Sequence, residues 1–353
     1  MTPAQLKPIS LELELRARDE GFLASGISIP DLENDANLLN QWWKAGRGGQ
    51  MSYLVKHGSK RWKTDELVPG TQRVLSFLYP AWPVESDSYD TLSNPDRAYI
   101  ARYALGRDYH RIVRQRLQRL AAWLDASVPG STNRPFVDSA PVLEKRIAQQ
   151  AGLGWIGKNT LLIHPKAGSV FFIGEIYSSI AFEPSQPFQG EHCGQCSACI
   201  DVCPTRALVA PQQLDARLCL SYWSIESKDA IPESIRPALG NRIFGCDDCQ
   251  LVCPWNKFAQ LAHQMEQQAR HQLSTIDLVT LAFWTEEDYL QKTEGSALRR
   301  MGFESFQRNI AVALGNARSS DLNLRAVNHL LHQGTPLVQE HAAWALRRLK
   351  SST

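Results

Sequence analysis

All eight cysteines of this 353-residue sequence lie in one window, between Cys193 and Cys253. Cysteine side chains can bind zinc or iron–sulfur clusters, or they can pair as disulfides. A disulfide framework would spread the cysteines over the whole chain, because it cross-links distant segments. The clustering therefore predicts metal or redox chemistry.

The first run of cysteines has the spacing C-x2-C-x2-C-x3-C-P. It consists of Cys193, Cys196, Cys199, Cys203 and Pro204. In bacterial ferredoxins, the first three cysteines of such a run bind one 4Fe-4S cluster and the fourth binds a second cluster. A zinc ribbon needs only paired C-x2-C motifs, without the third cysteine or the proline. The run therefore favours iron–sulfur clusters over structural zinc.

The second run has the spacing C-x2-C-x3-C-P and ends at Cys253 and Pro254. It lacks a leading cysteine, because Ile243 stands at that position, and Cys219 is the thiol left to replace it. Two 4Fe-4S clusters need eight thiolates, which is the number in the chain. Exchange of the fourth cysteine between the runs predicts Cys193, Cys196, Cys199 and Cys253 for one cluster and Cys203, Cys219, Cys246 and Cys249 for the other.

Two neighbouring clusters form a path for single electrons, and such a path needs a terminus. A free-standing ferredoxin would be much shorter, whereas about 190 residues precede the cysteine window and about 100 follow it. A chain of this length forms about two domains, or one large domain with a module. We therefore expect the flanking segments to supply the site at which the electrons are used.

The overall composition is that of an ordinary globular protein. Hydrophobic residues make up 43% of the chain and charged residues 21%, and the net charge of +2 indicates no partner by itself. No run of 18 apolar residues occurs, so we expect no membrane span. The amino-terminal residues lack the apolar core of a secretion signal and the paired arginines of the other common export route, which predicts a cytoplasmic protein.

Residue periodicity predicts both strands and helices before the cysteines. A helix opens the chain, residues 73–80 form a buried strand, and residues 97–124 form a basic helix or helix pair. A further helix begins with a proline and covers 141–150, and residues 160–163 and 169–177 form a hairpin. Together these elements indicate an α/β or α+β domain.

After the cysteines, the pattern becomes helical. A Gln-rich helix is predicted around residues 263–272, followed by three short helices over 306–317, 321–333 and 336–349. Asp321 is expected to cap the second of these three helices, and Pro336 to open the third. Short helices at this spacing suggest a fragment of a helical repeat.

Positive charge gathers in two segments. The seven arginines of 97–124 leave two interpretations open, a solvated helix face or an anion-binding surface. Residues 290–353 contain nine Lys and Arg against four Asp and Glu, a local charge of +5, so the rest of the chain carries −3. A basic helical tail suits a polyanion such as a nucleic acid, and a solvated helix face is the alternative.

The glycines Gly152, Gly154 and Gly157 match the dinucleotide-binding pattern G-x-G-x-x-G. In a dinucleotide site this pattern follows a strand and opens a helix, whereas here it is expected to follow a helix and open a strand. The context therefore argues against nicotinamide or flavin binding. The loop could still approach another flat ligand, with Lys158 and Asn159 supplying polar contacts.

Asp138 is an isolated acid between short apolar segments. Desolvation could raise its pKa and make it a proton donor, but an aspartate before a helix is more often a cap, and the residues alone favour the cap. The histidines are expected to have structural or surface roles and are not compelled to be ligands. They include His57, His110, His164 and His192.

Taken together, these motifs resemble the epoxyqueuosine reductases, which complete queuosine in the anticodon of certain transfer RNAs. The segments that carry the resemblance are VDSAPVLEKRIAQQAGLGWIGKNTLL, CGQCSACIDVCPTRAL, LCLSYWSIE and FGCDDCQLVCPWN, followed by the helical tail. The resemblance covers essentially the whole chain. The combination is far more specific than the ferredoxin run alone.

The resemblance implies an α+β fold in three parts. Residues 1–185 would form an α/β domain that binds cobalamin, and residues 186–260 a ferredoxin-like module with two 4Fe-4S clusters. Residues 261–353 would form a HEAT-like helical repeat that binds tRNA.

The resemblance also implies roles for individual residues, and it makes Asp138 a proton donor rather than a cap. The residues expected to line the cobalamin site are Arg61, Asp138, Lys145, Gly157, Lys158, Asn159, Ser221 and Tyr222. The arginines expected to contact tRNA are Arg299, Arg300, Arg347 and Arg348.

The implied reaction removes the epoxide oxygen of epoxyqueuosine in tRNA and consumes two electrons and two protons. The electrons would come from an external donor, and a monomer would suffice for this substrate. A related reductive dehalogenase is one alternative, although an export signal would be expected in such an enzyme. An electron-transfer protein with clusters and no corrin is the other.

Overall fold

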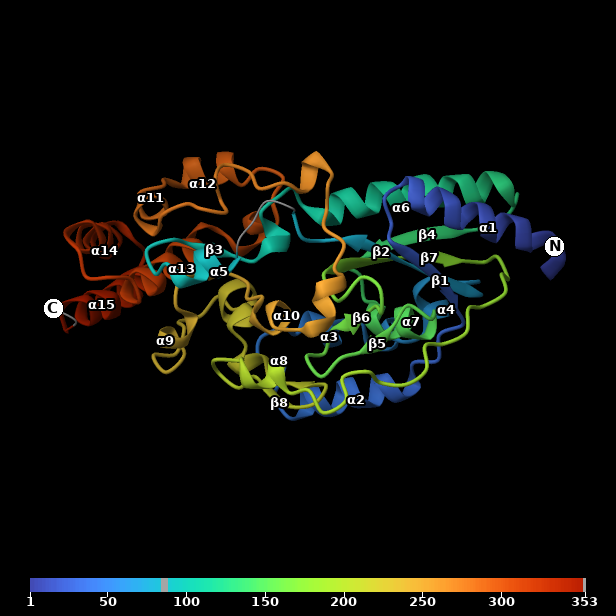
Figure 1. The fold of residues 1–353 in the computed structure, drawn as a ribbon, viewed down its shortest axis with the longest axis horizontal. Helices are drawn as coiled ribbons and strands as arrows, with labels where there is room; N and C mark the ends of the chain where they lie inside the picture. The colour runs from blue at the N-terminus through green and yellow to red at the C-terminus, as the bar shows by residue number, and fades with distance from the viewer. Residues whose placement is uncertain (84–87, 352–353) are drawn as a thin grey trace.

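Four strands form an antiparallel sheet in the order β1-β2-β7-β4, toward the amino-terminal end of the molecule (Figure 1). The computed structural model describes residues 1–83 and 88–351. The strands are β1 Ala24–Ser28, β2 Arg73–Pro80, β4 Asn133–Val137 and β7 Phe171–Ser178. The strand predicted for 73–80 is confirmed as β2, which is buried from Val74 to Pro80.

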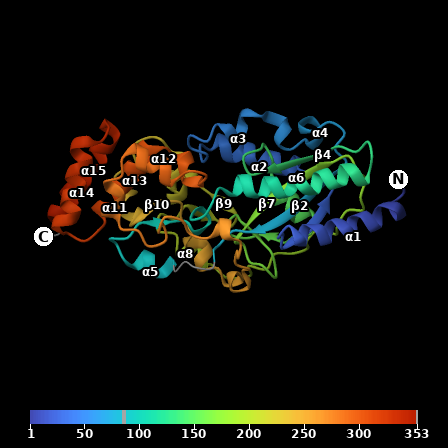
Figure 2. The same ribbon diagram turned by 90° about the horizontal axis from the view of Figure 1, so that it is seen from above.

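Helices α1 (Pro3–Asp19) and α6 (Tyr109–Ser127) cover one face of the sheet, and α7 (Glu144–Gln150) lies against the other (Figures 1 and 2). Gly174 of β7 allows α6 to approach closely, because a Cβ atom at this position would lie 2.7 Å from Leu117 Cδ1. The predicted apolar stripe of α6 is buried, and it comprises Ile112, Val113, Leu117, Leu120 and Leu124.

The opening helix is confirmed as α1. Leu11 and Leu15 are exposed, whereas Leu6 and Leu13 are buried against α6 and the sheet. The remaining helices of the amino-terminal half are α2 Glu33–Lys44, α3 Tyr53–Lys56, α4 Thr64–Leu67 and α5 Ser88–Ser93.

Two helices begin later than the sequence pattern predicts. α6 begins at Tyr109 rather than near residue 97, because Asp108 caps its first turn by accepting a hydrogen bond from the His110 backbone N–H. α7 begins at Glu144 rather than at Pro141. Part of the segment before α6 forms β3 (Tyr99–Ile100) instead.

The predicted hairpin of 160–163 with 169–177 is wrong in its pairing. An isolated antiparallel bridge joins His164 and Gly168, which lie in the sequence between the two predicted strands. β6 (Leu162–Ile163) pairs with β5 (Trp155–Ile156), while β7 pairs with β2 on one edge and β4 on the other. Because both edges of β7 are already occupied, no ladder position remains for β6.

The cysteine segment lies between the sheet and the carboxy-terminal helices (Figure 1). Its short elements are α8 Ala198–Asp201, β8 Leu208–Ala210, β9 Gln213–Leu214, α9 Arg236–Leu239, β10 Arg242–Phe244 and α10 Asp248–Leu251. A π-helical turn covers Tyr222–Glu226. β10 pairs in parallel with β3, so residues 98–105 pack with the carboxy-terminal core rather than with the sheet.

The carboxy-terminal part is helical, as predicted. Its helices are α11 Leu278–Ala282, α12 Glu286–Lys292, α13 Phe303–Gly315, α14 Asp321–Gln333 and α15 Pro336–Ser351. α13 is buried along most of its length and packs against both α14 and α15. Residues 352 and 353, at the end of the predicted tRNA-binding region, lie outside the described residues.

Two details of this part correct the sequence predictions. The Gln-rich segment forms only a 3-10 turn at Met265–Gln267 and not a helix. Ser320, rather than Asp321, caps α14, because the Ser320 hydroxyl accepts a hydrogen bond from the Asn323 backbone N–H. Pro336 begins α15, and Gly334 ends α14, as predicted. Within the described residues, no helix is both long and apolar enough to cross a membrane.

Candidate functional site

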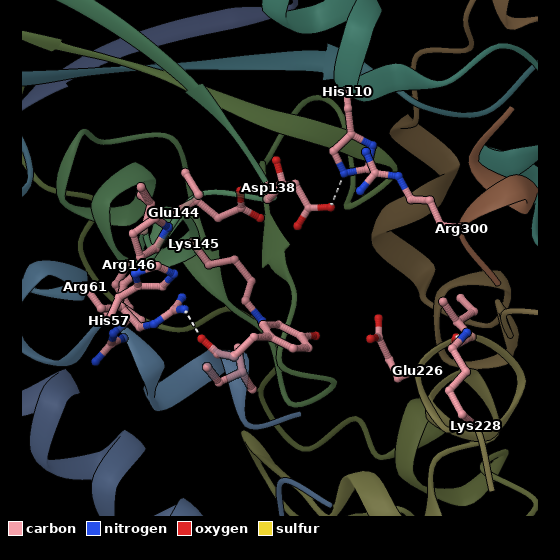
Figure 3. A pocket seen from close by; sticks show the side chains of 18 residues that line it. His57, Arg61, His110, Asp138, Glu144, Lys145, Arg146, Glu226, Lys228 and Arg300 are labelled. Atoms are coloured by element: carbon pink, nitrogen blue, oxygen red, sulfur yellow. Dashed lines mark hydrogen bonds and ion pairs between the residues drawn. The ribbon is translucent and has the colours of Figure 1, made fainter. Parts of the chain in front are cut away.

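A cavity of about 630 Å³, here called the site cavity, lies where the sheet meets the cysteine segment and the carboxy-terminal part (Figure 3). It is rich in titratable side chains that come from distant parts of the sequence. They are His57, Arg61, His110, Asp138, Glu144, Lys145, Arg146, Glu226, Lys228 and Arg300. The π-helical turn contributes Glu226, in keeping with the frequent occurrence of such turns at functional sites.

Asp138 follows β4 directly and lines the site cavity. Its backbone has a positive φ of 42°, a conformation that aspartate tolerates better than most residues. The interpretation of Asp138 as a helix cap is wrong, because Leu143 occupies the cap position of α7. The backbone turn instead places the carboxylate in the cavity, where 49% of its side chain remains exposed.

Two residues at the start of α6 hold the Asp138 carboxylate. The Tyr109 hydroxyl donates a hydrogen bond to Asp138 Oδ2. His110 Nε2 lies 3.0 Å from the same oxygen (Figure 3). The other nitrogen of the imidazole, Nδ1, lies 2.7 Å from Asp108 Oδ1. Arg300 lies 3.6 Å from Asp108 Oδ2, so the charged groups follow one another in the order Asp138, His110, Asp108 and Arg300.

Aromatic stacking fixes the start of α6 against the sheet. The Tyr109 ring stacks on Phe172 of β7 with a centroid distance of 3.8 Å and an interplanar angle of 3°. His110 stacks on the other side of Tyr109 at 4.0 Å. Sequence reasoning missed Tyr109 and assigned His110 a structural or surface role, although the Asp-Tyr-His segment at the beginning of a basic helix was available as a signal.

The electrostatics of Asp138 differ from the expectation that its surroundings would raise its pKa. Burial alone would raise the pKa of Asp138, but hydrogen bonds from His110 and Tyr109, with the charges of His110 and Arg300, lower it below its ordinary value. Burial would lower the pKa of His110, but its contacts with Asp108 and Asp138 raise it. In this pair the proton therefore favours His110.

Glu144 and Glu175 form a second acidic group beside Asp138. Burial, together with the charge of Asp138, raises the pKa of Glu144 to about 8. Glu175 on β7 is fully buried, neither of its carboxylate oxygens has a hydrogen-bond partner among the described residues, and burial raises its pKa well above its ordinary value. Both groups therefore hold protons at neutral pH.

We expect Glu144→Gln to stabilise the protein at alkaline pH. The unfolded chain ionises Glu144 near its ordinary pKa of about 4.3, whereas the folded protein keeps the proton up to about pH 8. The wild-type penalty is therefore absent below pH 4, grows as the pH rises and is complete above pH 8. Thermal unfolding should show a smaller difference in apparent Tm at pH 5 than at pH 8, where the apparent Tm of the variant should be at least about 2 °C higher. The exposed Glu183→Gln is the control, and a constant difference at all pH values would contradict this assignment.

The structure brings the first predicted set of cysteines together. Cys193, Cys196, Cys199 and Cys253 line a common cavity of about 100 Å³. Burial raises the pKa of the Cys199 thiol, and the neighbouring Cys193, Cys253 and Cys196 raise it further. Cys253 comes from the second run, so the exchange of the fourth cysteine between the runs agrees with the geometry.

The second predicted set lies deeper. Burial raises the pKa of the Cys249 thiol, with contributions from Cys219 and Cys203, and Cys246 is likewise affected by Cys219. Burial raises the pKa of the Cys219 thiol, and hydrogen bonds from the backbone N–H groups of Tyr222 and Ser221 offset part of this rise, as donors to a bound thiolate would. Four thiols in each of two adjacent groups fit two 4Fe-4S clusters.

The residues predicted to line the cobalamin site do not all lie in one place. Arg61 and Lys145 lie in the site cavity with Asp138. Lys158 donates hydrogen bonds to the Gly194 and Cys196 carbonyls at 2.7 and 2.9 Å, so it lies at the first set of cysteines. Asn159 lines the same cysteine cavity.

Gly157, Ser221 and Tyr222 are not among the residues that line the site cavity. The glycine loop follows α7 and opens β5, as predicted from its context. Its glycines accommodate the chain itself, because a Cβ atom at Gly154 would lie 2.0 Å from the Ile163 carbonyl oxygen. Tyr222 accepts a hydrogen bond from the Gln50 backbone N–H at 3.0 Å.

The four arginines predicted to contact tRNA do not form one surface. Arg300 lines the site cavity, whereas Arg347 and Arg348 lie on α15 at the far end of the molecule (Figure 1). Arg347 forms an ion pair with Glu233 at 3.1 Å, and Arg348 donates a hydrogen bond to the Gly315 carbonyl at 3.2 Å.

A second cavity, of about 460 Å³ and here called the arginine cavity, lies beside the start of α6. Its lining includes Arg107, Asp108 and Arg111. Arg116 and Arg119 also line it, and both form ion pairs with Glu20. The arginines of this region therefore fit neither interpretation as a group, because some line a cavity and some are already paired with a carboxylate.

Comparison with known proteins places these features in context. A family model described as a 4Fe-4S double cluster binding domain matches residues 192–256, and one described as epoxyqueuosine reductase QueG, DUF1730 matches residues 61–139. A curated epoxyqueuosine reductase of Pseudomonas aeruginosa is 51% identical over 331 residues, which cover 94% of this chain and 92% of that protein. The one from Escherichia coli is 43% identical over 98% of this chain and 90% of its own length.

Solved structures agree with the sequence comparisons. A crystal structure of epoxyqueuosine reductase with an epoxyqueuosine-modified tyrosine tRNA stem loop superposes with a TM-score of 0.88 at 26% identity, covering 98% of this chain and 91% of that chain. A Bacillus subtilis epoxyqueuosine reductase, described with its catalytic aspartate loop swung out of the active site, matches equally well at 26% identity with the same coverage.

Proposed function

Because the chain belongs to the epoxyqueuosine reductase family, we propose that it reduces epoxyqueuosine to queuosine at the wobble position of the tRNA anticodon, the last step of queuosine formation. This proposal rests mainly on one observation. Asp138 lines a cavity that is rich in titratable side chains, in a chain that also holds two sets of four thiols. A relative solved with an epoxyqueuosine tRNA stem loop supports tRNA as the substrate.

The proposal includes two 4Fe-4S clusters and cobalamin. The match to a double cluster domain supports the iron–sulfur clusters, which the two sets of cysteines would hold. For cobalamin, the site cavity offers Arg61, whose buried Nε has no hydrogen-bond partner among the described residues, and the ammonium group of Lys145. Such donors suit the amide groups around a corrin. When bound, cobalamin supplies the reducing power at the substrate carbon.

The protein's own residues would bind and orient the substrate and move protons. Removal of an epoxide oxygen needs two electrons and two protons, and the oxygen departs more easily when it is protonated. Asp138 is the proton donor in this proposal, with Tyr109 holding its carboxylate in place. The description of a catalytic aspartate loop in the relative from Bacillus subtilis supports this role.

We further propose the three-part organisation of 1–185, 186–260 and 261–353, with a HEAT-like repeat formed by α13, α14 and α15. The protein would act as a cytoplasmic monomer and receive electrons from an external donor. Cys196 is the exposed member of the first cysteine set, which suggests that electrons enter there. The more deeply buried second set would then pass them toward the site cavity.

Two alternatives differ in their cofactors or substrate. A reductive dehalogenase would act on a small organohalide, and the relatives described above favour the reductase instead. An electron-transfer protein would contain clusters and no corrin, and the titratable site cavity argues against it. Cobalt and iron counts with an absorbance spectrum of anaerobic protein separate this second class from the enzymes.

The decisive experiment is incubation of anaerobic, reconstituted protein with epoxyqueuosine tRNA and a reductant, followed by mass analysis of the nucleosides. We expect a product that is lighter by one oxygen. Protein that contains clusters and cobalamin but leaves the epoxide intact would refute the proposal.

We expect tRNA binding to weaken steeply with salt, because phosphate contacts release counterions. Arg347→Glu and Arg348→Glu together should lower the slope of log affinity against log salt by about 2, if each arginine contacts one phosphate. Binding measured over a series of salt concentrations tests this contribution. Arg18→Glu on α1, at the opposite end of the molecule, is the control, and an equal slope in both proteins would argue against α15 as a tRNA-binding element.

A further inference from the structure

Asp108 and His110 form the wall between two cavities. His110 lines the site cavity together with Asp138, and Asp108 lines the arginine cavity on the other side of the wall. The His110 side chain is almost enclosed, with 13% of its surface exposed, and each of its ring nitrogens faces a carboxylate oxygen. The imidazole therefore links the two cavities.

The contacts of His110 with Asp108 and Asp138 require one proton more than a neutral imidazole between two ionised carboxylates carries. A neutral imidazole carries a hydrogen on only one nitrogen, and ionised carboxylates can only accept hydrogen bonds. Nδ1 lies 2.7 Å from Asp108 Oδ1 and Nε2 lies 3.0 Å from Asp138 Oδ2, so each contact needs a hydrogen. One additional proton must therefore reside on His110 or on one of the two carboxylates.

We propose that His110 stores the proton that Asp138 passes to the substrate, and that the arginine cavity is the route by which this proton is replaced. The inference rests on the proposed function and adds a residue to the same site. His110 acts through Asp138, so it is a positioning residue and does not itself touch the reacting atoms. A substrate that fills the site cavity excludes water there, whereas the arginine cavity stays on the other side of the wall.

The proton transfers balance the reaction. The epoxide loses its oxygen as water and gains a C=C double bond, which consumes two electrons from the external reductant and two protons. For each proton, the His110 Nε2–H bond breaks as an O–H bond forms on Asp138 Oδ2. That O–H bond then breaks as an O–H bond forms on the departing oxygen. Two such transfers complete one water molecule, and His110 regains each proton from solvent that reaches Asp108.

The surroundings of His110 favour its protonated form. Burial opposes the charge, but the hydrogen bonds and charges of Asp108 and Asp138 outweigh it and raise the pKa of His110. The other charged groups nearby, on α7, the π-helical turn and the segment before α13, are Glu144, Lys145, Glu226 and Arg300. Arg300 lies 3.6 Å from Asp108 Oδ2, and Arg107 and Arg111 line the arginine cavity beside Asp108, so positive charge on that side opposes the effect of the two carboxylates without reversing it.

A measurement without substrate tests whether His110 holds the proton. Exchange of the imidazole C2 hydrogen for deuterium in the holoprotein, followed by mass spectrometry of its peptides, reports the titration of each histidine. We expect a midpoint for His110 above the ordinary value of about 6.5 and a lower midpoint in Asp138→Asn. A wild-type midpoint at or below 6.5 overturns the proposal, whatever the protein does with tRNA.

A kinetic measurement tests whether the stored proton is used. His110→Gln keeps a side-chain donor but cannot store a titrating proton, so we expect single-turnover reduction of epoxyqueuosine tRNA to slow on the order of 100-fold at neutral pH. The variant should also lose the decline in rate that wild type shows as the pH rises through the His110 titration, while its affinity for tRNA stays unchanged. His263→Gln, an exposed histidine, is the matched control and should keep the wild-type rate.

The outcomes separate this inference from the proposed function. A His110→Gln rate within about twofold of wild type, or an unchanged pH profile, overturns the role of His110. If wild-type protein with both cofactors leaves the epoxide intact, the proposed function fails, and the exchange midpoint still decides whether His110 holds a proton.

Discussion

Asp138→Asn is expected to slow epoxide reduction by about 100-fold or more, while the protein keeps its clusters and cobalamin. Asparagine has nearly the same shape, and its amide oxygen can still accept a hydrogen bond from Tyr109. It cannot carry a transferable proton between His110 and the substrate, so the departing oxygen would have to leave unprotonated. Single-turnover reduction followed by nucleoside mass analysis measures the effect.

The matched control is Asp19→Asn, which removes an exposed carboxylate at the end of α1 and should leave the rate unchanged. Absorbance spectra must show equal cluster and cobalamin contents in both variants. An Asp138→Asn protein with full cofactor content and a normal rate would refute the proton-donor role. The Tyr109 hydroxyl would then be the next candidate, because it reaches the same oxygen.

Pairs of cysteine substitutions are expected to distinguish the two ligand sets by their iron content. Cys199→Ala with Cys253→Ala removes two ligands of the same predicted cluster, so about four of eight irons should remain. Cys199→Ala with Cys249→Ala removes one ligand from each cluster and should lower the iron content further. Both proteins should lose reduction of epoxyqueuosine with an external donor, because each breaks the electron path.

Iron analysis and electron paramagnetic resonance of the reduced proteins measure these differences. Cys203→Ala with Cys249→Ala is the reciprocal pair, since both residues belong to the second set. If the ligands were not exchanged between the runs, the Cys199 and Cys253 pair would instead damage both clusters. Equal iron loss in the Cys199–Cys253 and Cys199–Cys249 pairs would therefore contradict the exchanged assignment.

Local spacing was sufficient for features whose partners lie close in the sequence. The strand β2, the helix α15 that begins at Pro336, and the context of the glycine loop all followed from short-range patterns. Pairing of β7 did not, because the edges of a strand are occupied by distant segments that the local pattern cannot identify. The late start of α6 depended on the cap at Asp108, a single side chain within a continuous basic segment.

The chemistry of the site divides in the same way. From the sequence alone came the cysteine window and the two predicted sets of four thiols, because these rest on residue type and short spacing, whereas the proton-donor role of Asp138 came from the resemblance to a known family. Only the tertiary structure decided which residue of the site holds the proton. Asp138 and His110 are 28 positions apart, and their contact reverses the effect that burial alone has on the pKa of each. Hydrogen bonds and charges act over a few ångströms. Which residue holds the proton therefore depends on which segments of the chain the fold brings into contact.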